Sequence, residues 1–394
     1  VSSCRPMRID FHASQRSSLG VEWELEIVDR RTRQLAGAAS EVLAELGGGR
    51  PDGHPKAKHE LLESTIEVIT GVCGTVAEAR ADLAGTVAEV DALLAPRGLA
   101  AMCSGTHPFS DWAEQQISPN PRYARLVEEM QWLARRLQIF GVHVHVGVRS
   151  AEKAIAIANA VSAYIPHFLA LSASSPFWQG SDTGLSSSRS KVFEALPTAG
   201  LPYQLAGWGE FEQLMTTLVS SKAITSIREV WWDIRPHPDF GTVELRICDG
   251  LPRLSEIAAC AALSQCLVEW MDGLVDRGYS LPVPKGWVVR ENKWKAARYG
   301  LDADIIVDDA GTLRPVRDAL LELVEELAPV ARRLDCADEL ASVVDVMAEG
   351  PSARRQREVV AAGGTLVDVV DALIAELATD RPVHAPLPTA PLSR

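Results

Sequence analysis

The sequence predicts an α+β fold built around a mainly antiparallel sheet. Segments of strand composition alternate irregularly with segments of helical periodicity, and the connections between them are short. Short connections suit antiparallel pairing, whereas a doubly wound parallel sheet needs long crossovers. No linker-like break divides the middle of the chain, so we expect a single domain over residues 1–380, followed by a proline-rich, disordered tail over residues 381–394.

The expected strands have β-branched or alternating sequences, and the expected helices begin at capping residues. The strands are residues 20–28, 65–70, 141–148 and 241–247. Thr75 and Glu78 form a capping-box pattern before an amphipathic run to Leu94. Asn120, followed by a proline, opens a helix that we expect to continue to about Leu137. Further helices are expected at residues 255–275, 314–334 and 365–377.

Composition and charge argue against two classes of protein. The 394-residue chain is 47% hydrophobic and 23% charged, which is typical of a globular protein. Its net charge of −13 argues against a nucleic-acid-binding protein, which needs a basic surface. Residues 154–180 carry no charge and are long enough to cross a bilayer, but they include Asn159, Pro166 and His167 and are rich in alanine. We therefore expect a buried helix there, and no membrane association.

The N-terminal residues and the cysteines indicate a cytoplasmic protein. Arg5, Arg8 and Asp10 interrupt the first apolar residues, so no signal peptide is expected. The seven cysteines are odd in number, scattered in spacing and without a C-x-x-C pair. Free, mostly buried thiols in a reduced compartment are the expected arrangement.

Residues 21–28 are the most informative segment, because apolar and acidic residues alternate along it. The alternation places Glu22, Glu24 and Glu26 on one face of a strand and apolar side chains on the other. Glutamate is depleted in strands, and three carboxylates on one face repel each other. A divalent cation such as Mg²⁺ over that face would balance the repulsion. A solvated edge strand is the alternative, and this segment alone does not decide between the two.

A second acidic segment contains Glu60, Glu63 and Glu67. In a helix all three would share a face, but residues 64–70 have strand composition. A regular strand points Glu60 and Glu67 in opposite directions, so a bulge or a break between two elements is needed to bring them together. The sequence from His59 also resembles the zinc-protease pattern H-E-x-x-H, but the second histidine is missing.

Two later strands carry further candidate residues. His143 and His145 share a strand face, where they can ligate a metal, contact phosphate or simply pair with neighbouring side chains. Glu244 and Arg246 share a face of another strand, either as a structural ion pair or as a cation ligand beside a phosphate-binding arginine. Arg235 is a second candidate arginine for holding a phosphoryl group.

Two segments outside the strands are candidate binding loops. A turn-rich loop contains Thr183 and ends in Arg189, whose guanidinium can hold a substrate carboxylate. Residues 290–300 place four basic residues, Lys293 and Arg298 among them, in a short helical stretch that can face a nucleotide. Either segment can equally be ordinary solvated surface. The chain has no glycine-rich phosphate loop, so a bound nucleotide would depend on carboxylate-held Mg²⁺ and arginines.

The order and spacing of these motifs resemble the glutamate–cysteine ligase type 2 family, which are carboxylate–amine ligases with a glutamine synthetase-like catalytic fold. The motifs are residues 20–24, 59–67, 141–145, 175–184, 231–236 and 242–246. The resemblance covers residues 19–303. It implies a curved, mainly antiparallel sheet that forms a funnel-like active site flanked by helices, with ATP entering one end and Mg²⁺ at the waist.

The resemblance also implies roles for individual residues. Arg246 matches the arginine beside the phosphates, and His145 stands where some related ligases have asparagine. The residues that match the family's metal-binding positions are Glu22, Glu24, Glu60, Glu67, His143 and Glu244. The chain after about Ala303 matches no family motif.

The first hypothesis is therefore an ATP-dependent carboxylate–amine ligase. The carboxylate, by resemblance the γ-carboxylate of glutamate, would be activated as an acyl phosphate and attacked by an amine, with cysteine as the default amine. The partners would be these small molecules, and the resemblance implies a homodimer. The alternative is a zinc-dependent amidohydrolase-like hydrolase with His143, His145, His167 and His237 as ligands, which leaves the acidic strand unexplained. A non-catalytic member that binds a metabolite or a partner is the third hypothesis.

Overall fold

An antiparallel sheet of seven strands forms the centre of the fold and confirms the predicted α+β class. The structure, a computed structural model, describes residues 7–387. The strand order is β10-β11-β5-β1-β3-β2, with β4 also paired to β1, and every pairing is antiparallel. The strands are β1 (Leu19–Asp29), β2 (Ala57–His59), β3 (Thr65–Ile69), β4 (Leu99–Met102), β5 (Gly141–Gly147), β10 (Ile234–His237) and β11 (Thr242–Asp249).

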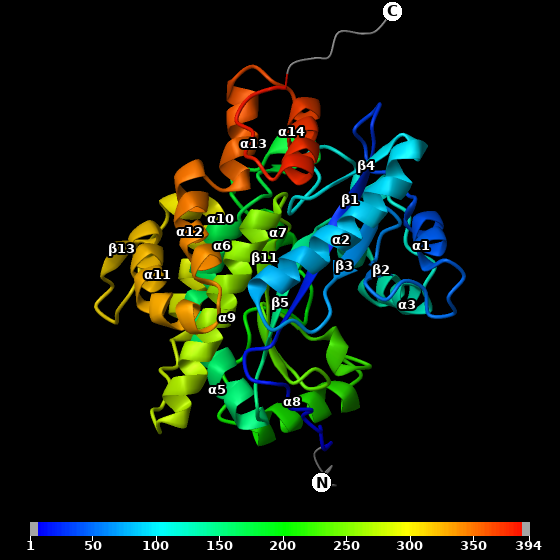
Figure 1. Cartoon of the computed structure of the whole chain (residues 1–394). Coiled ribbons are helices and arrows are strands. Elements are labelled where there is room, and N and C mark those ends of the chain that lie inside the picture. Colours follow the sequence, from blue (N-terminus) through cyan, green and yellow to red (C-terminus); the bar gives the residue numbers. More distant parts are fainter. Residues whose placement is uncertain (1–6, 388–394) are drawn as a thin grey trace, which may run out of the picture.

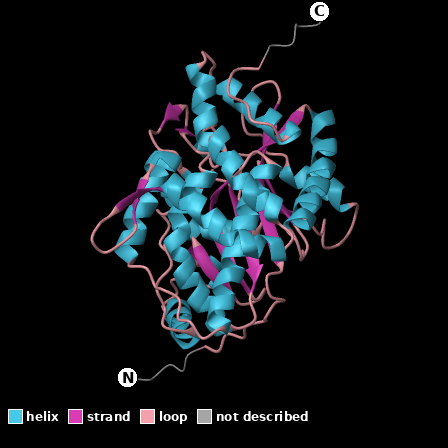
Figure 2. Cartoon of the chain, turned by 60° about the vertical axis from the view of Figure 1, so that its left-hand side comes forward, coloured by secondary structure: helices cyan, strands magenta, loops and turns pink. Residues whose placement is uncertain are grey.

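Helices surround this sheet, and Figure 2 shows the strands behind a layer of them. The helices are α1 (Ala39–Gly47), α2 (Val76–Leu94), α3 (Pro121–Met130), α4 (Trp132–Arg135), α5 (Ala151–Val161), α6 (Ile165–Ser172), α7 (Arg189–Phe193), α8 (Trp208–Ser220), α9 (Leu254–Asp276), α10 (Gly286–Tyr299), α11 (Val316–Arg333), α12 (Ala337–Glu349), α13 (Ser352–Ala361) and α14 (Leu366–Thr379). Short two-stranded sheets pair β6 (Phe177–Trp178) with β7 (Ser181–Asp182), β8 (Ala199–Gly200) with β9 (Trp231–Trp232), and β12 (Asp304–Ile306) with β13 (Leu313–Pro315).

The alternating sequence of β1 gives the sheet one apolar and one acidic face. Val21, Trp23, Leu25 and Ile27 are at most 2% exposed, and they belong to the main core together with residues of α2 and α9. Figure 1 shows α2 crossing β1 and β3 on this side. Because side chains alternate along a strand, the glutamates of β1 point to the opposite face. The site described below is built on that acidic face.

Two predicted helices differ from the structure in detail. Thr75 caps α2 by accepting a hydrogen bond from Glu78 N, but the Glu78 carboxylate accepts from Gly74 N, so the reciprocal capping box is not formed. The helix that was predicted to reach Leu137 ends at Met130, because Gln131 has a φ of 50° and ψ of −122°, which interrupts the helical hydrogen bonding before α4. The other three predicted helices correspond to α9, α11 and α14.

The uncharged segment lies inside the protein. It forms α5 and α6, joined by a short 3₁₀ turn at residues 162–164. Residues 151–172 and α9 are long and apolar enough to span a membrane, but 83% and 78% of their most apolar windows are buried in the protein, as in core helices. In the tail predicted from Arg381, residues 388–394 lie outside the described part, and residues 381–387 form no helix or strand.

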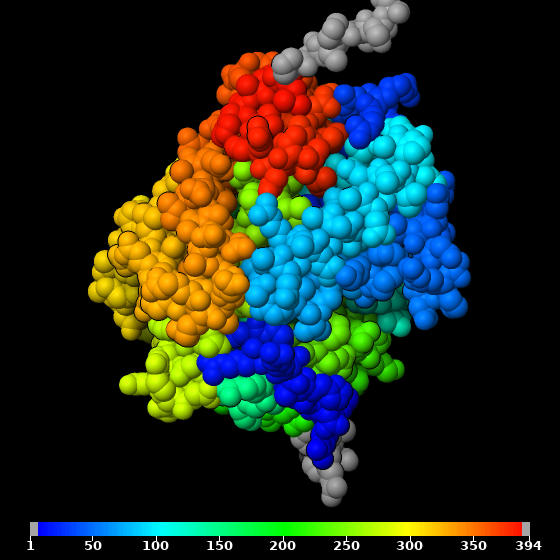
Figure 3. Space-filling view, in the orientation of Figure 1, coloured from blue at the N-terminus to red at the C-terminus, as the bar shows by residue number. Residues whose placement is uncertain are grey.

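A buried ion cluster attaches the C-terminal helices to the core. Arg355 of α13 is 1% exposed and holds Glu376 of α14 through two bonds of 2.7 and 2.8 Å. It also donates to Glu256 of α9 at 2.7 Å and to Gly350 O at 2.6 Å. Figure 3 shows the C-terminal helices packed beside the N-terminal part of the chain. The region without a family motif is thus joined to the same core.

Replacing Arg355 with alanine is expected to destabilise the fold by about 3–5 kcal/mol, because the buried Glu376 loses its counter-ion and the buried Glu256 keeps only Arg253. Arg354→Ala is the control, since the Arg354 side chain is 54% exposed and pairs with Glu358 at the surface. Its cost should stay within about 1 kcal/mol. Denaturant unfolding of both variants measures the difference. A loss below about 1 kcal/mol for Arg355→Ala would mean that the cluster does not hold the C-terminal helices.

The buried His107 should make the stability of the fold depend on pH. His107 is 0% exposed; Phe109 N and Ser110 N donate to its Nδ1 at 3.2 and 3.0 Å, and its Nε2 donates to Arg33 O at 2.9 Å. Burial lowers the pKa of His107 from 6.5 to about 3. Below pH 6.5 the His107 ring is protonated in the unfolded chain but stays neutral in the folded chain. The folded state therefore loses stability as the pH falls.

The expected loss is up to about 1.4 kcal/mol per pH unit below pH 6.5. Replacing His107 with Asn keeps an oxygen acceptor near the two N–H groups and removes the titrating ring. Denaturant unfolding at pH 7.5 and pH 5 should therefore show a smaller difference in the variant than in the native chain. An equal pH dependence in both would contradict the assignment.

Candidate active site

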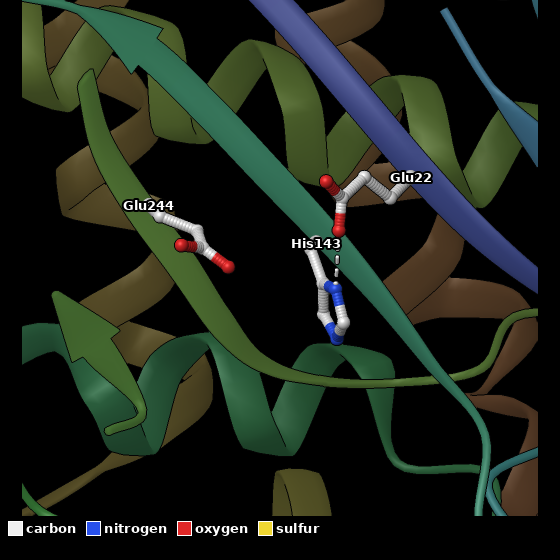
Figure 4. Close-up of side chains that lie close together, drawn as sticks. All are labelled: Glu22, His143 and Glu244. Atoms are coloured by element: carbon white, nitrogen blue, oxygen red, sulfur yellow. Dashed lines mark hydrogen bonds and ion pairs between the residues drawn. The ribbon is translucent and has the colours of Figure 1, made fainter. Parts of the chain in front are cut away.

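The strand register brings the acidic and imidazole side chains together on one face of the sheet. In the antiparallel pairs, Glu22 of β1 lies opposite His143 of β5, and Glu24 lies opposite Glu67 of β3. Glu244 of β11 joins them from the other side of β5, as Figure 4 shows. Two sets of potential metal ligands have atoms within 4.8 Å of one another: Glu22, His143 and Glu244, and Glu24, Glu67 and His143. We call these five side chains, together with Glu60, the acidic row.

Glu60 reaches this row because β2 ends at His59 and β3 begins only at Thr65. This turn is the break between two elements that the sequence analysis predicted between Glu60 and Glu67. Glu60 lines the same cavity as Glu24. Glu63 turns away and accepts hydrogen bonds from Ser40 N and Oγ in the first turn of α1.

Glu26 also leaves the site. It is 0% exposed and accepts hydrogen bonds from Ser104 N and Oγ, both at 2.9 Å. Burial raises the pKa of Glu26 well above its usual value, which favours the neutral form of this core carboxyl.

The protein balances the charge of the row unequally. Although burial opposes it, Arg235 and Arg246 hold the pKa of Glu244 below its usual range, and His145 and His143 do the same for Glu22. By contrast, burial and the neighbouring Glu60 raise the pKa of Glu24 to about 8. Burial and neighbouring glutamates likewise raise the pKa values of Glu60 and Glu67. These three carboxylates lack a sufficient counter-charge from the protein, which is the environment of a cation site.

The two histidines have different positions in the row. His143 Nδ1 donates to Glu22 Oε2 at 2.8 Å, and its Nε2 lies 3.8 Å from Glu24 Oε1, so the ring stands between both ligand sets. Burial lowers the pKa of His143 to about 4, which favours the neutral imidazole that a metal requires. His145 lies beyond Glu22, with Nε2 3.2 Å from Glu22 Oε1 and Nδ1 3.1 Å from Thr242 Oγ1.

Two arginines flank Glu244. Arg235 Nε donates to Glu244 Oε2 at 2.6 Å, and Arg246 Nη1 donates to Glu244 Oε1. The pairing of β11 with β5 slips by one residue between Leu245 and Cys248, so Arg246 stands in a β-bulge. Its Nε is buried and has no partner among residues 7–387, while Arg246 lines a cavity. The bulge therefore places a charged side chain in the wall of that cavity.

Two cavities lie on either side of the row. The central cavity, about 110 Å³, is lined by Glu24, Glu60, His143, Arg246 and Arg189 together with apolar side chains. The outer cavity has a volume of about 420 Å³, and its lining includes Glu22, His145, Lys58, Val72 and Phe240. The acidic row thus separates a small arginine-lined cavity from a larger, mostly apolar one.

The predicted substrate arginine reaches the central cavity. Arg189 is 4% exposed, and its guanidinium makes only long contacts: 3.4 Å to Arg246 O, 3.5 Å to Ile247 O and 3.9 Å to Asp249 Oδ1. Its buried Nε has no partner in the described chain. Gly141 leaves the space for it, because a Cβ there would lie 2.3 Å from Arg189 Nη2. Thr183 instead donates to Pro176 O at 2.8 Å and shapes the loop.

Two predicted nucleotide-binding residues lie away from both cavities. Lys293 is 1% exposed and pairs with Asp233 at 2.5 Å and Glu194 at 2.6 Å. Arg298 donates to Gly184 O and lines a separate cavity. The predicted helix is present as α10, but none of the four basic residues in this stretch lines the central or the outer cavity.

Sequence reasoning missed two lining residues, Arg122 and Tyr123. Both line the central cavity from the first turn of α3. The Tyr123 hydroxyl donates to His59 O at 3.1 Å, next to Glu60. The available signal was the Asn120 cap, whose Oδ1 accepts from Arg122 N at 2.9 Å and so places both residues at the helix start.

The zinc-hydrolase alternative receives no support. Within the described residues, each converging set of possible ligands contains one histidine and two glutamates. His167 lies in α6 beside Tyr164, and His237 stacks on Phe240 with ring centroids 4.2 Å apart. A zinc site rich in histidine is not assembled by these rings.

Comparisons with known proteins find relatives along nearly the whole chain. The profile of "Glutamate-cysteine ligase family 2" matches residues 18–372. "Putative glutamate--cysteine ligase 2-1" of Frankia alni is 62% identical over 96% of this chain and 100% of its own length. "Putative glutamate--cysteine ligase 2" of Thermobifida fusca is 55% identical over 95% of this chain and 94% of its own length.

Two solved structures have a similar fold. The glutamate–cysteine ligase of Francisella tularensis, solved in complex with AMP, superposes with a TM-score of 0.67 over 94% of this chain and 90% of its own, at 13% identity. A bifunctional glutathione synthetase from Pasteurella multocida superposes with a TM-score of 0.68 over 93% of this chain and 52% of its own, at 14% identity. At such low identity these similarities concern the fold.

Proposed function

The chain belongs to glutamate-cysteine ligase family 2 and is an ATP-dependent carbon–nitrogen ligase, and from this premise we propose that it activates the γ-carboxylate of glutamate and joins it to an amine, with cysteine as the default. The observation that carries the proposal is the acidic row between two cavities. A ligase of this kind must hold ATP and an acid on either side of the transferring phosphoryl group.

The two cavities suit different reactants. The outer cavity is the larger and is mostly apolar, and Phe240, 53% exposed, offers an aromatic surface to a base. We assign ATP to it. The central cavity holds Arg189, Arg122 and Arg246, whose guanidinium groups match substrate carboxylates and a transferring phosphoryl group. We assign the acid and the amine to this cavity.

The row fits a divalent cation. It offers five carboxylates and a neutral imidazole, and three of the carboxylates lack a sufficient counter-charge from the protein. Glu22, His143 and Glu244 would hold one Mg²⁺, and Glu24, Glu60 and Glu67 a second. When bound, Mg²⁺ neutralises charge on phosphate oxygens during phosphoryl transfer.

The chemistry follows from the poor leaving ability of a carboxylate oxygen. Transfer of the γ-phosphoryl group of ATP to that oxygen forms an acyl phosphate and ADP. The amine nitrogen then bonds to the acyl carbon, the carbon–oxygen bond to phosphate breaks, and the nitrogen's proton passes to phosphate or to a carboxylate of the row. Arg246 stabilises the transferring group, Arg235 orients Glu244, and Arg189 holds a substrate carboxylate. Apolar residues around the central cavity limit the access of water.

A substrate panel tests this proposal. Amino acids and amines are combined with Mg-ATP, and ADP and the amide product are measured together. We expect ADP release that requires Mg²⁺, an acid and an amine, and amide in equal amount. With ¹⁸O in the glutamate γ-carboxylate, one label should appear in the released phosphate. Amide formed with no label in phosphate would rule out the acyl phosphate, and turnover that needs Zn²⁺ without ATP would favour the hydrolase.

A further inference from the structure

A third cavity lies outside the active site, between α10, α11 and α13, and we propose that it binds a small phosphate-bearing molecule. We call it the α10–α13 cavity; Figure 1 shows α13 at the top of the molecule, α11 at the left and α10 between them. Its volume is about 410 Å³, the size of many small-molecule sites. The arginines that line it are Arg298, Arg317, Arg354 and Arg357.

The charge of this cavity is opposite to that of the chain. The whole chain has 52 acidic and 39 basic residues, whereas the α10–α13 cavity has four arginines and only two lining carboxylates, Asp302 and Glu358. Arginine presents five donors in a planar fork that matches phosphate oxygens. A cavity with this balance attracts an anion and disfavours a cation.

Several of these donors have no partner. Arg354 uses Nε on Glu358 Oε1 at 2.8 Å, and within residues 7–387 neither of its terminal nitrogens makes a hydrogen bond. Arg317 donates from Nη1 to Met347 O at 3.0 Å and only weakly from Nη2 to Asp302 at 3.4 Å. The unpaired N–H groups provide the bonds that a phosphate group needs.

One further feature favours a phosphate with an organic group attached. The cavity includes Tyr299, which is 52% exposed and has the Arg298 guanidinium 5.0 Å from its ring centroid. This ring is a flat surface for a sugar or a base.

The same arginines hold the loop that carries Arg189. Arg298 donates to Gly184 O, and Arg357 donates to Leu185 O at 2.8 Å and pairs with Asp182 at 2.6 Å. Arg189 follows four residues after Leu185 and lines the central cavity. One loop therefore touches both cavities.

The far end of the loop is anchored beside the central cavity. Asp249 accepts from Ser175 Oγ at 2.6 Å and from Ser187 Oγ at 2.8 Å, and Arg189 N donates to Ser175 Oγ at 3.1 Å. A phosphate in the α10–α13 cavity competes with the loop oxygens for Arg298 and Arg357. Binding thereby loosens residues 182–189. Its effect on substrate binding rests on the proposed function; the binding itself does not.

Calorimetric titration of the full chain with pyrophosphate tests the binding. EDTA is added to remove divalent metal ions. Without a metal the acidic row repels pyrophosphate, whereas binding in the α10–α13 cavity needs no metal. We expect one site in the native chain, at least tenfold weaker binding in Arg354→Ala, and unchanged binding in Arg246→Ala, the matched active-site control. Arg317→Gln is a second variant with the same expected loss, in case Arg354→Ala is poorly folded.

Hydrogen exchange with and without pyrophosphate tests the coupling. Amides of residues 182–189 should exchange faster with the ligand bound, and those of α2 should not change.

Three results of the titration would overturn the proposed site: no binding by the native chain, binding by Arg354→Ala and Arg317→Gln that equals native binding, or loss of binding in Arg246→Ala alone. Unchanged exchange in the loop would overturn the coupling. These readouts need no turnover, so they stand apart from a failure of the ligase assignment.

Discussion

Replacing Glu24 with Gln is expected to abolish Mg²⁺-dependent ADP formation, by roughly 10³-fold or more, while the fold stays intact. The carboxylate lies opposite Glu67 and faces His143, in one of the two ligand sets. Glutamine has the same shape but contributes neither charge nor a second carboxylate oxygen. Since burial and Glu60 raise the pKa of Glu24 to about 8, the metal-free protein already accommodates a neutral group there. Coupled ADP measurement and thermal unfolding check both parts.

Glu26→Gln is the matched control for this prediction. It lies two residues along the same strand, but its carboxyl is buried against Ser104 and belongs to neither ligand set, and burial raises its pKa well above the usual value. Turnover should therefore remain within about twofold of the native value, since a raised pKa favours the neutral carboxyl, which glutamine resembles, and this side chain contacts no ligand set. If Glu24→Gln were as active as the native enzyme, the assignment of Glu24 as a metal ligand would be wrong. Equal loss in both variants would show a general effect on the strand.

Arg246→Ala is expected to lose phosphoryl transfer by roughly 10²- to 10³-fold and to keep metal binding. Arg246 shares Glu244 with Arg235, so the carboxylate retains one counter-ion after the substitution. Its Nε has no protein partner in the described chain and the side chain lines the central cavity, which indicates that its free donors serve a ligand. ADP formation measures the transfer, and Mn²⁺ binding followed by electron paramagnetic resonance measures the metal site.

Arg246→Lys separates charge from geometry in this position. Lysine restores the positive charge but not the planar fork that binds two oxygens at once. We expect partial activity, between the alanine variant and the native enzyme. Native turnover in Arg246→Ala, or loss of Mn²⁺ in that variant, would contradict its assignment to the phosphoryl group.

Much of the site could be predicted because strand alternation is a local property. The period of two in residues 21–28 was enough to place Glu22 and Glu24 on the face opposite Trp23, and the structure has them there. The same argument put His143 on the ligand face of β5 and Glu244 on that of β11. The break after His59, inferred from the mismatch between Glu60 and Glu67, is also present.

Other residues could not be placed by periodicity. Glu26 shares its face with Glu24, yet Ser104 from the segment after β4 covers it and makes it a core residue. Lys293 was a candidate because of its charge, but Asp233 and Glu194, distant in sequence, neutralise it. Arg122 and Tyr123 gave no signal of their own, since a residue in the first turn of a helix can face any direction.

The sequence by itself determined which face of β1 is acidic, where several of the helices begin, and which family the motifs resemble, because these depend on neighbours along the chain. Only the tertiary structure decided which charges share a cavity and which are neutralised. That outcome depends on the register between strands, on the bulge that turns Arg246 and on the loop that brings Arg189 under Gly141. Contacts between residues far apart in the chain have no local pattern, so the α10–α13 cavity had no signature before the helices were packed.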